Sequence, residues 1–310
     1  MEHMTFPELR DKMMRLYTEG KFADALQLVE QNADRFPEQG ASTTFWKMCL
    51  LSLCGRPDDL IAVFQNGLDK GLWWAAKQFL DTDLDAVRDL PEFKRLAALS
   101  QEKYEEVRRH IPRDRTLLLP EPPTSGKYPL LIALHGRNGN KDSNLEHWEA
   151  ARQRGWLVLS PQSTQPLFPG SYCWDEVGLG LTDLRYYYED VLQSYPIDPD
   201  RILIGGFSQG SGMAIYAALK GGLVVRGFIG IGTWWADADE LARERKDIRG
   251  YFVTGEKDHT LDRVREIQDT LQRNNVPFSE EVHADIGHEF PADFERSFDK
   301  AIDFIFMEQE

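Results

Sequence analysis

From Thr116 to the end of the chain, short β-branched and apolar runs alternate with amphipathic stretches of helical length. Two of the runs, LLIAL (130–134) and ILIGG (202–206), are apolar without alternation, which is typical of strands buried on both faces. This order of elements predicts an α/β fold, with a mainly parallel sheet and helices on both faces. Ligands of such sheets bind just past the carboxyl ends of the strands, so catalytic residues are expected there.

The same runs give the expected bounds of each element. Strands are expected over residues 115–119, 130–134, 156–160, 201–205, 225–231, 250–254 and 279–284. Helices are expected over residues 145–154, 181–195, 209–219, 237–246, 260–274 and 292–306.

The first hundred residues differ from the rest, because they contain no strand-like run and show helical spacing throughout. A charged helix over 102–109 ends shortly before Pro112, which would interrupt a continuing helix. We therefore expect a helical domain over residues 1–110 and an α/β domain over residues 111–310. A chain of 310 residues is long enough for two such cores.

The helical domain contains a candidate internal repeat. A shift of 35 residues superimposes Met13 on Met48, Leu16 on Leu51, Gly20 on Gly55 and Asp24 on Asp59. The period is close to the roughly 34 residues of a tetratricopeptide unit, and GKFADA (20–25) followed by Pro37 resembles the second helix of that family. The second copy departs from the family at Leu60 and Leu72. The domain is expected to bind a protein partner, to act as a lid, or only to pack against its neighbour.

Ser208 is the candidate nucleophile. It lies in GFSQG (206–210), directly after an apolar strand and directly before a helix-compatible segment. A serine at such a strand-to-helix turn has a strained backbone, and the residues two before and two after it must be tiny so that strand and helix can approach. The alternative is a tight turn with an incidental serine.

A serine hydroxyl needs a nearby base, which a carboxylate in turn orients. His288 is the preferred base because it follows the last expected strand and Gly287. His283 and His259 are alternatives; the first lies inside a strand and the second adjoins the proposed acid. A surface role for His288 is the remaining alternative.

Asp258 is the preferred orienting acid, since it ends the segment YFVTGEKD at the carboxyl edge of the sheet. Glu256 and Asp262 compete with it, but the expected helix carries Asp262 away from that edge. The chain order Ser208, Asp258, His288 is the order expected for loops of this architecture.

Acyl transfer also requires donors directed at the developing oxyanion. The backbone N–H of Gln209 is one candidate, because it follows the nucleophile at a helix start. The backbone N–H of Arg137 is the other, because His135-Gly136 ends a strand and lets the chain turn. An ordinary strand-ending turn is the alternative for the second. The side chain of Arg137 is expected to point to solvent or to bind an acidic substrate group.

Four motifs make the chain similar to α/β hydrolases of the phospholipase/carboxylesterase group, such as acyl-protein thioesterases and small carboxylesterases. They are LHG (134–136), GGFSQG (205–210), GEKD (255–258) and GH (287–288). The resemblance covers about residues 115–310. It implies a Ser208–His288–Asp258 triad, oxyanion amides at Arg137 and Gln209, and no metal or organic cofactor. The chain departs from the family at Arg137-Asn138, at Thr254 and in its helical domain.

Three tryptophans are expected at the carboxyl edge of the sheet. Trp174, Trp234 and Trp235 are candidates for the wall of the substrate pocket, with packing at the domain interface as the alternative. Bulky indoles there would shorten the acyl slot, so small or aromatic acyl groups are expected before long lipid chains.

The composition of the chain disfavours two classes of binding partner. The chain has 36 Lys and Arg against 51 Asp and Glu, and its net charge of −15 disfavours nucleic acid and anionic membranes. No apolar run reaches the roughly 18 to 20 residues of a membrane span, and MEHMTFPELRDKMMR lacks the apolar core of a secretory signal. We therefore expect a cytoplasmic protein with three reduced cysteines.

The expected function is a serine carboxylesterase or thioesterase that cleaves small or medium acyl esters through an acyl-enzyme. A dienelactone-type hydrolase is disfavoured because serine stands where that chemistry uses cysteine. A peptidase of the same fold stays open. The alternative from another class is a helical-repeat scaffold that binds a protein and carries a degenerate hydrolase domain.

Overall fold

The computed structural model describes residues 4–121, 126–241 and 248–307. The chain divides into two compact units. The first comprises Met1–Ile111 and Pro166–Ser171, and the second comprises Pro112–Gln165 and Tyr172–Glu310.

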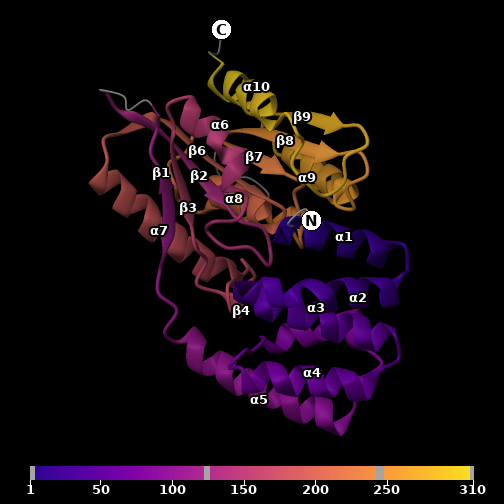
Figure 1. The fold of residues 1–310 in the computed structure, drawn as a ribbon. Coiled ribbons are helices and arrows are strands. Elements are labelled where there is room, and N and C mark those ends of the chain that lie inside the picture. The colour runs from indigo at the N-terminus through magenta and orange to yellow at the C-terminus, as the bar shows by residue number, and fades with distance from the viewer. Residues whose placement is uncertain (1–3, 122–125, 242–247, 308–310) are drawn as a thin grey trace. The chain divides into compact units, whose positions relative to one another are not determined.

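The first unit is helical (Figure 1). Its α-helices are α1 (Phe6–Thr18), α2 (Phe22–Asn32), α3 (Gly40–Leu53), α4 (Pro57–Asp69) and α5 (Pro91–Arg108). Short 3₁₀ helices are η1 (Ala33–Arg35), η2 (Pro37–Gln39), η3 (Ala76–Leu80) and η4 (Thr82–Leu84). The strand β4 (Pro166–Phe168) belongs to this unit, where the Ala75 N–H donates to the Leu167 carbonyl at 2.7 Å and Phe45 stacks on Phe168.

The candidate repeat corresponds to two helical hairpins. Helices α1 and α2 form one and helices α3 and α4 the other, and the two turns contain Gly20 and Gly55 at φ +72° and +67°. Glycine takes this left-handed conformation without steric cost, which explains why both copies have it there. Membership of the tetratricopeptide family stays a prediction.

The second unit contains a seven-stranded sheet with the order β1-β3-β2-β6-β7-β8-β9. Its strands are β1 (Arg115–Leu118), β2 (Tyr128–Leu134), β3 (Leu157–Pro161), β6 (Ile197–Phe207), β7 (Gly227–Ile231), β8 (Arg249–Gly255) and β9 (Phe278–His283). Strand β1 is antiparallel to β3 and the other neighbours are parallel. The two-residue strand β5 (Ser171–Tyr172) pairs with β4 outside this sheet.

Helices cover both faces of the sheet (Figure 1). They are α6 (Leu145–Gln153), α7 (Val177–Ser194), α8 (Gln209–Lys220), α9 (Leu261–Arg273) and α10 (Phe294–Phe306). Alternate residues of β2 face opposite sides: Leu130 and Ile132 join a core with α7, α8 and α9, whereas Leu131 and Ala133 join one with α6 and α10. The expected fold class is confirmed.

Most expected elements differ from the observed bounds by one or two residues, and three differ by more. Strand β6 starts at Ile197, four residues before its expected start. Helix α7 starts at Val177, four residues before its expected start, because Gly178 and Gly180 weaken the helical pattern of its first turn. Residues 238–241 form a 3₁₀ helix, η5 (Ala238–Leu241), where an α-helix was expected. The Asp237 carboxylate accepts the Asp239 N–H at 2.9 Å, a turn that competes with α-helix formation. Residues 242–247 of that expected helix lie outside the described residues.

Candidate active site

Ser208 sits at the sharp turn between β6 and α8 with a left-handed backbone, φ 54° and ψ −122°. A Cβ at Gly210 would lie 2.2 Å from the His135 carbonyl oxygen, and one at Gly206 would lie 2.6 Å from the Gly210 carbonyl carbon. Only glycine fits at either position, as the GFSQG pattern predicts. The strained turn persists because its surroundings hold it: the Ser208 N–H donates to the Ile231 carbonyl at 2.8 Å.

His288 and Asp258 form a hydrogen-bonded pair at the carboxyl edge of the sheet. The Nδ1 atom of His288 lies 2.9 and 3.0 Å from the two carboxylate oxygens of Asp258. The Asp258 side chain is only 1% exposed, and Oδ1 also accepts from the N–H and the hydroxyl of Thr260, each at 2.8 Å. Burial raises the pKa of Asp258, but hydrogen bonds from His288 and Thr260 outweigh burial and lower it overall. The carboxylate is therefore ionised at neutral pH.

The carboxyl end of β7 lies between His288 and the nucleophile turn, so the two are neighbours. A Cβ at Gly232 would lie 2.9 Å from Asp258 Oδ2 and 3.0 Å from His288 Nδ1, and Gly232 directly follows the residue that accepts the Ser208 N–H. The ring of Phe207 lies 4.7 Å from that of His288. Among the described residues, neither the Ser208 hydroxyl nor His288 Nε2 makes a hydrogen bond, so the structure does not join these two atoms.

The turn after β2 is held by a buried imidazole. His135 Nδ1 lies 2.9 Å from the Gly136 carbonyl oxygen, and His135 Nε2 accepts the Ser163 N–H at 3.4 Å. Burial lowers the pKa of His135 to about 4, so the ring is neutral at pH 7. Because a carbonyl oxygen only accepts, the ring hydrogen is on Nδ1. The Gly139 N–H also donates to the Gly136 carbonyl, at 3.1 Å.

The Gly136–Arg137 peptide is thereby fixed by its oxygen, and its N–H points to the opposite side. Within the described part of the chain, the N–H groups of Arg137 and Gln209 donate no hydrogen bond. Gln209 is the first residue of α8, where the helix dipole favours negative charge.

Comparison with known families gives two matches. Residues 189–305 match the phospholipase/carboxylesterase family, and residues 5–108 match a domain described as A/B hydrolase-like, N-terminal. The second unit therefore has the α/β-hydrolase fold, and residues 189–305 within it are similar to the phospholipase/carboxylesterase family. No curated protein gives a significant sequence match to the chain.

Solved structures share the fold of this hydrolase. An uncharacterized protein from Bacillus cereus ATCC 10987 matches with 24% identity over 98% of this chain and 99% of its own, at a TM-score of 0.54. Esterase PE8 matches with 15% identity over 63% of this chain and 99% of its own, at a TM-score of 0.50. An S-formylglutathione hydrolase from Agrobacterium tumefaciens matches with 13% identity over 62% and 88%, also at 0.50.

The side chains of the two candidate oxyanion residues of the hydrolase meet at Asp175. Asp175 Oδ1 accepts from the Arg137 guanidinium and from Gln209 Nε2, each at 2.6 Å. Gln209 Oε1 in turn accepts the Trp174 backbone N–H at 3.0 Å. The Arg137 side chain is 37% exposed and lies in this ion pair, so it does not simply extend into solvent as expected. The sequence does not predict this role of Asp175. The only signal for Asp175 in the sequence is its position directly after Trp174.

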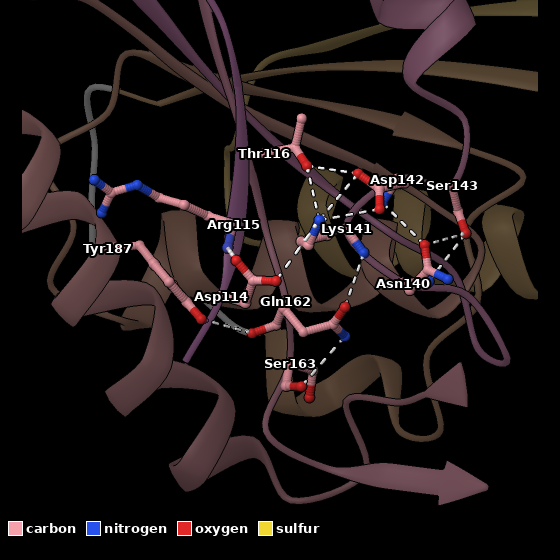
Figure 2. Close-up of polar contacts among 10 residues, drawn as sticks. All are labelled: Asp114, Arg115, Thr116, Asn140, Lys141, Asp142, Ser143, Gln162, Ser163 and Tyr187. Carbon is pink, nitrogen blue, oxygen red and sulfur yellow. Dashed lines mark hydrogen bonds and ion pairs between the residues drawn. The ribbon is translucent and has the colours of Figure 1, made fainter. Parts of the chain in front are cut away.

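A second polar network holds the rest of the loop after β2, and sequence reasoning did not find it. Figure 2 shows Lys141 Nζ between Asp142, Thr116 and Asp114, at 3.0, 3.3 and 3.6 Å. The Lys141 N–H donates to the buried side chain of Gln162 at 3.1 Å. These contacts tie the loop to β1 and to the end of β3.

The three tryptophans differ in exposure. Trp174 is buried and its indole donates to the His135 carbonyl at 2.9 Å. Trp235 is also buried, packs against Tyr216 and donates to Glu240 at 3.3 Å. Trp234 is 40% exposed, and its backbone N–H donates to the Ser208 carbonyl at 3.2 Å.

The rival candidates lie apart from the Asp258–His288 pair or serve other contacts. His283 lies in β9, with Nε2 3.4 Å from the Ser297 hydroxyl. Asp262 is exposed on α9 and pairs with Arg265. His259 is close, with its ring 4.5 Å from that of His288, but its side chain is 73% exposed.

No helix within residues 4–121, 126–241 and 248–307 is long and apolar enough to cross a membrane.

Proposed function

We propose that the chain is a serine carboxylesterase or thioesterase that cleaves small or medium acyl esters through a Ser208–His288–Asp258 triad. The observation that carries the proposal is the buried Asp258 carboxylate, 2.9 Å from Nδ1 of an imidazole beside the strained Ser208 turn. The similarity of residues 189–305 to the phospholipase/carboxylesterase family supports the same reaction class.

The proposed mechanism starts from the tautomer that Asp258 selects. Because the ionised carboxylate accepts a hydrogen from Nδ1, the lone pair of the neutral imidazole is on Nε2. His288 Nε2 takes the hydroxyl proton of Ser208, and Ser208 Oγ forms a bond to the ester or thioester carbonyl carbon. The imidazolium then gives its proton to the leaving alcohol or thiol, which departs as the acyl-enzyme forms. Water repeats the sequence and releases the acid.

The oxyanion of each tetrahedral intermediate would be held by the N–H groups of Arg137 and Gln209. Their lack of other partners in the described residues supports this role. A donor of this kind contributes about 10² to 10³ in rate. His135 and Asp175 support the two donors from behind, one through the Gly136 carbonyl and the other through the side chains of Arg137 and Gln209.

For the substrate pocket, we propose that the Trp234 indole forms the wall, since Trp234 is 40% exposed and its backbone N–H donates to the Ser208 carbonyl. Trp174 and Trp235 are buried and would shape the pocket only by supporting the residues in front of them. A large rigid indole beside the nucleophile favours short acyl groups. The substrate class is therefore a small-molecule ester or thioester with a short or medium acyl chain.

The test is hydrolysis of p-nitrophenyl acetate and butyrate by the full chain, Ser208→Ala and Ser194→Ala. Ser194 is an exposed serine at the end of α7 and serves as the matched control. Ser208→Ala should lose turnover and fluorophosphonate labelling, while Ser194→Ala keeps both. Equal turnover by Ser208→Ala would refute the mechanism. No labelling of the unmodified chain would favour the alternative, a helical binding scaffold with an inactive hydrolase domain.

A further inference from the structure

His259 lies next to the proposed triad, and the mechanism does not use it. One ligand atom each from Asp258, His259 and His288 lies within 4.8 Å of the other two. His259 stands edge-on to His288, with ring centroids 4.5 Å apart. Its exposed side chain leaves this group open to solvent on one side.

We propose that Asp258, His259 and His288 form a zinc site whose occupation inhibits the esterase. The inference rests on the proposed function, because zinc would take the group that serves as base. Two imidazoles and one carboxylate are a donor set that Zn²⁺ prefers, with water as the fourth ligand. Zinc here is an inhibitor and not a cofactor.

The distances suit such an ion. Atoms bound to zinc at about 2.0 to 2.2 Å lie about 2.8 to 3.6 Å from each other when the angle at the metal is between about 90° and the tetrahedral angle. His288 Nδ1 lies 2.9 Å from Asp258 Oδ1, and His259 Nδ1 lies 3.7 Å from the same oxygen. Coordination would require the exposed His259 side chain to rotate toward the other two ligands.

Zinc at this position removes the base without touching Ser208. The ion binds the Nδ1 lone pair of His288, so the hydrogen that Nδ1 donates to Asp258 leaves to solvent and Nε2 gains one from solvent. The imidazole is neutral before and after. With a hydrogen on Nε2, it has no lone pair to accept the Ser208 proton, and the first step of the reaction stops.

His259 supplies the third ligand, so its replacement separates the zinc site from the triad. The initial rate of p-nitrophenyl acetate hydrolysis is measured against buffered free zinc for the full chain, His259→Gln and His110→Gln. His110 is an exposed histidine in the first unit and the matched control. Each variant is compared with its own rate without zinc, and magnesium chloride tests whether any divalent cation acts.

Zinc should inhibit the full chain and His110→Gln, and a chelator should restore the rate. His259→Gln should need at least about tenfold more zinc for half-inhibition, the usual loss when a metal site is impaired. Magnesium should have no effect. Inhibition of His259→Gln at the same zinc concentration would overturn the proposal, as would a full chain that zinc does not inhibit.

Direct zinc binding distinguishes failure of the site from failure of the esterase. Cys49, Asp81 and Asp83 form a second group of possible ligands in the first unit, so Cys49→Ala is the background. Calorimetry with zinc chloride should show one equivalent bound by Ser208→Ala in this background, even if the chain has no esterase activity. Adding His259→Gln should abolish that binding. Equal binding by both would reject the site.

Discussion

His135 Nδ1 lies 2.9 Å from the carbonyl oxygen of Gly136, so a buried neutral imidazole holds the peptide that carries the Arg137 N–H. His135→Ala should lower kcat for p-nitrophenyl butyrate by up to about 10²-fold with a smaller change in KM, because the oxyanion donor loses its support. His135→Asn should restore part of the rate, since its side-chain amide can donate to the same carbonyl. An unchanged kcat in His135→Ala would contradict the role of this contact.

The same histidine predicts a pH dependence of stability. Because burial lowers the pKa of His135 to about 4, the unfolded chain binds a proton between about pH 6.5 and pH 4 that the folded chain does not. Folding stability therefore rises with pH across this window and falls on acidification. From pH 7 to pH 5 the contribution is a loss of about 2 kcal/mol in the free energy of unfolding.

Urea unfolding of the full chain and His135→Asn at these two pH values checks this prediction. Between pH 7 and pH 5, the free energy of unfolding should fall by about 2 kcal/mol less for His135→Asn than for the full chain. Equal losses would show that His135 is not the group responsible.

Gly210 tests the packing of the nucleophile turn. A Cβ there would lie 2.2 Å from the His135 carbonyl oxygen and 2.7 Å from that of Leu134, both backbone atoms that cannot move aside. Gly210→Ala should therefore cost several kcal/mol of stability, or prevent folding, as overpacking does. The control is Gly178→Ala in α7, where a Cβ meets nothing within 4 Å. Gly178→Ala should raise the melting temperature slightly, because alanine favours a helix over glycine by up to about 1 kcal/mol.

Trp234 tests the pocket. Trp234→Ala should raise kcat/KM for hexanoate esters relative to acetate esters by about tenfold, since room for even one more methylene group in a hydrophobic pocket is worth about 1 to 3 kcal/mol. Trp235→Phe is the matched control, because Trp235 is buried in the core. If both variants keep the chain-length preference of the unmodified protein, Trp234 is not the wall.

Asp258→Asn tests the tautomer argument. An amide can donate to Nδ1 of His288, which would put the ring hydrogen on Nε2 and lower kcat by about 10⁴-fold. Asp262→Asn, four residues further and exposed on α9, should keep nearly full activity. Similar rates for the two variants would leave Asp258 without the proposed function.

The fold class could be predicted from the sequence, as could the site residues that local sequence patterns mark. Buried parallel strands are apolar on both faces, and a serine between two glycines directly after such a strand is typical of a nucleophile turn. The sequence predicts Asp258 and His288 because each follows a strand at the same edge of the sheet, and their side chains are in contact. All of these signals lie within a few residues of the site that they indicate.

Contacts between distant segments could not be predicted in this way. Arg137 and Asp175 are 38 residues apart, and nothing in either sequence segment specifies the other. The indole of buried Trp174 donates to the His135 carbonyl, 39 residues away along the chain, and no local pattern reveals this contact. Lys141 and Gln162 join loops after different strands, so their network appears only once the sheet order is known.

The central claim is that Ser208 becomes acylated. The full chain is mixed with p-nitrophenyl butyrate, quenched in acid during turnover and digested, and the modified peptide is sequenced by mass spectrometry. We expect one butyryl group on Ser208 and none in Ser208→Ala. Butyrate on another residue, or turnover without any acylated serine, would contradict it.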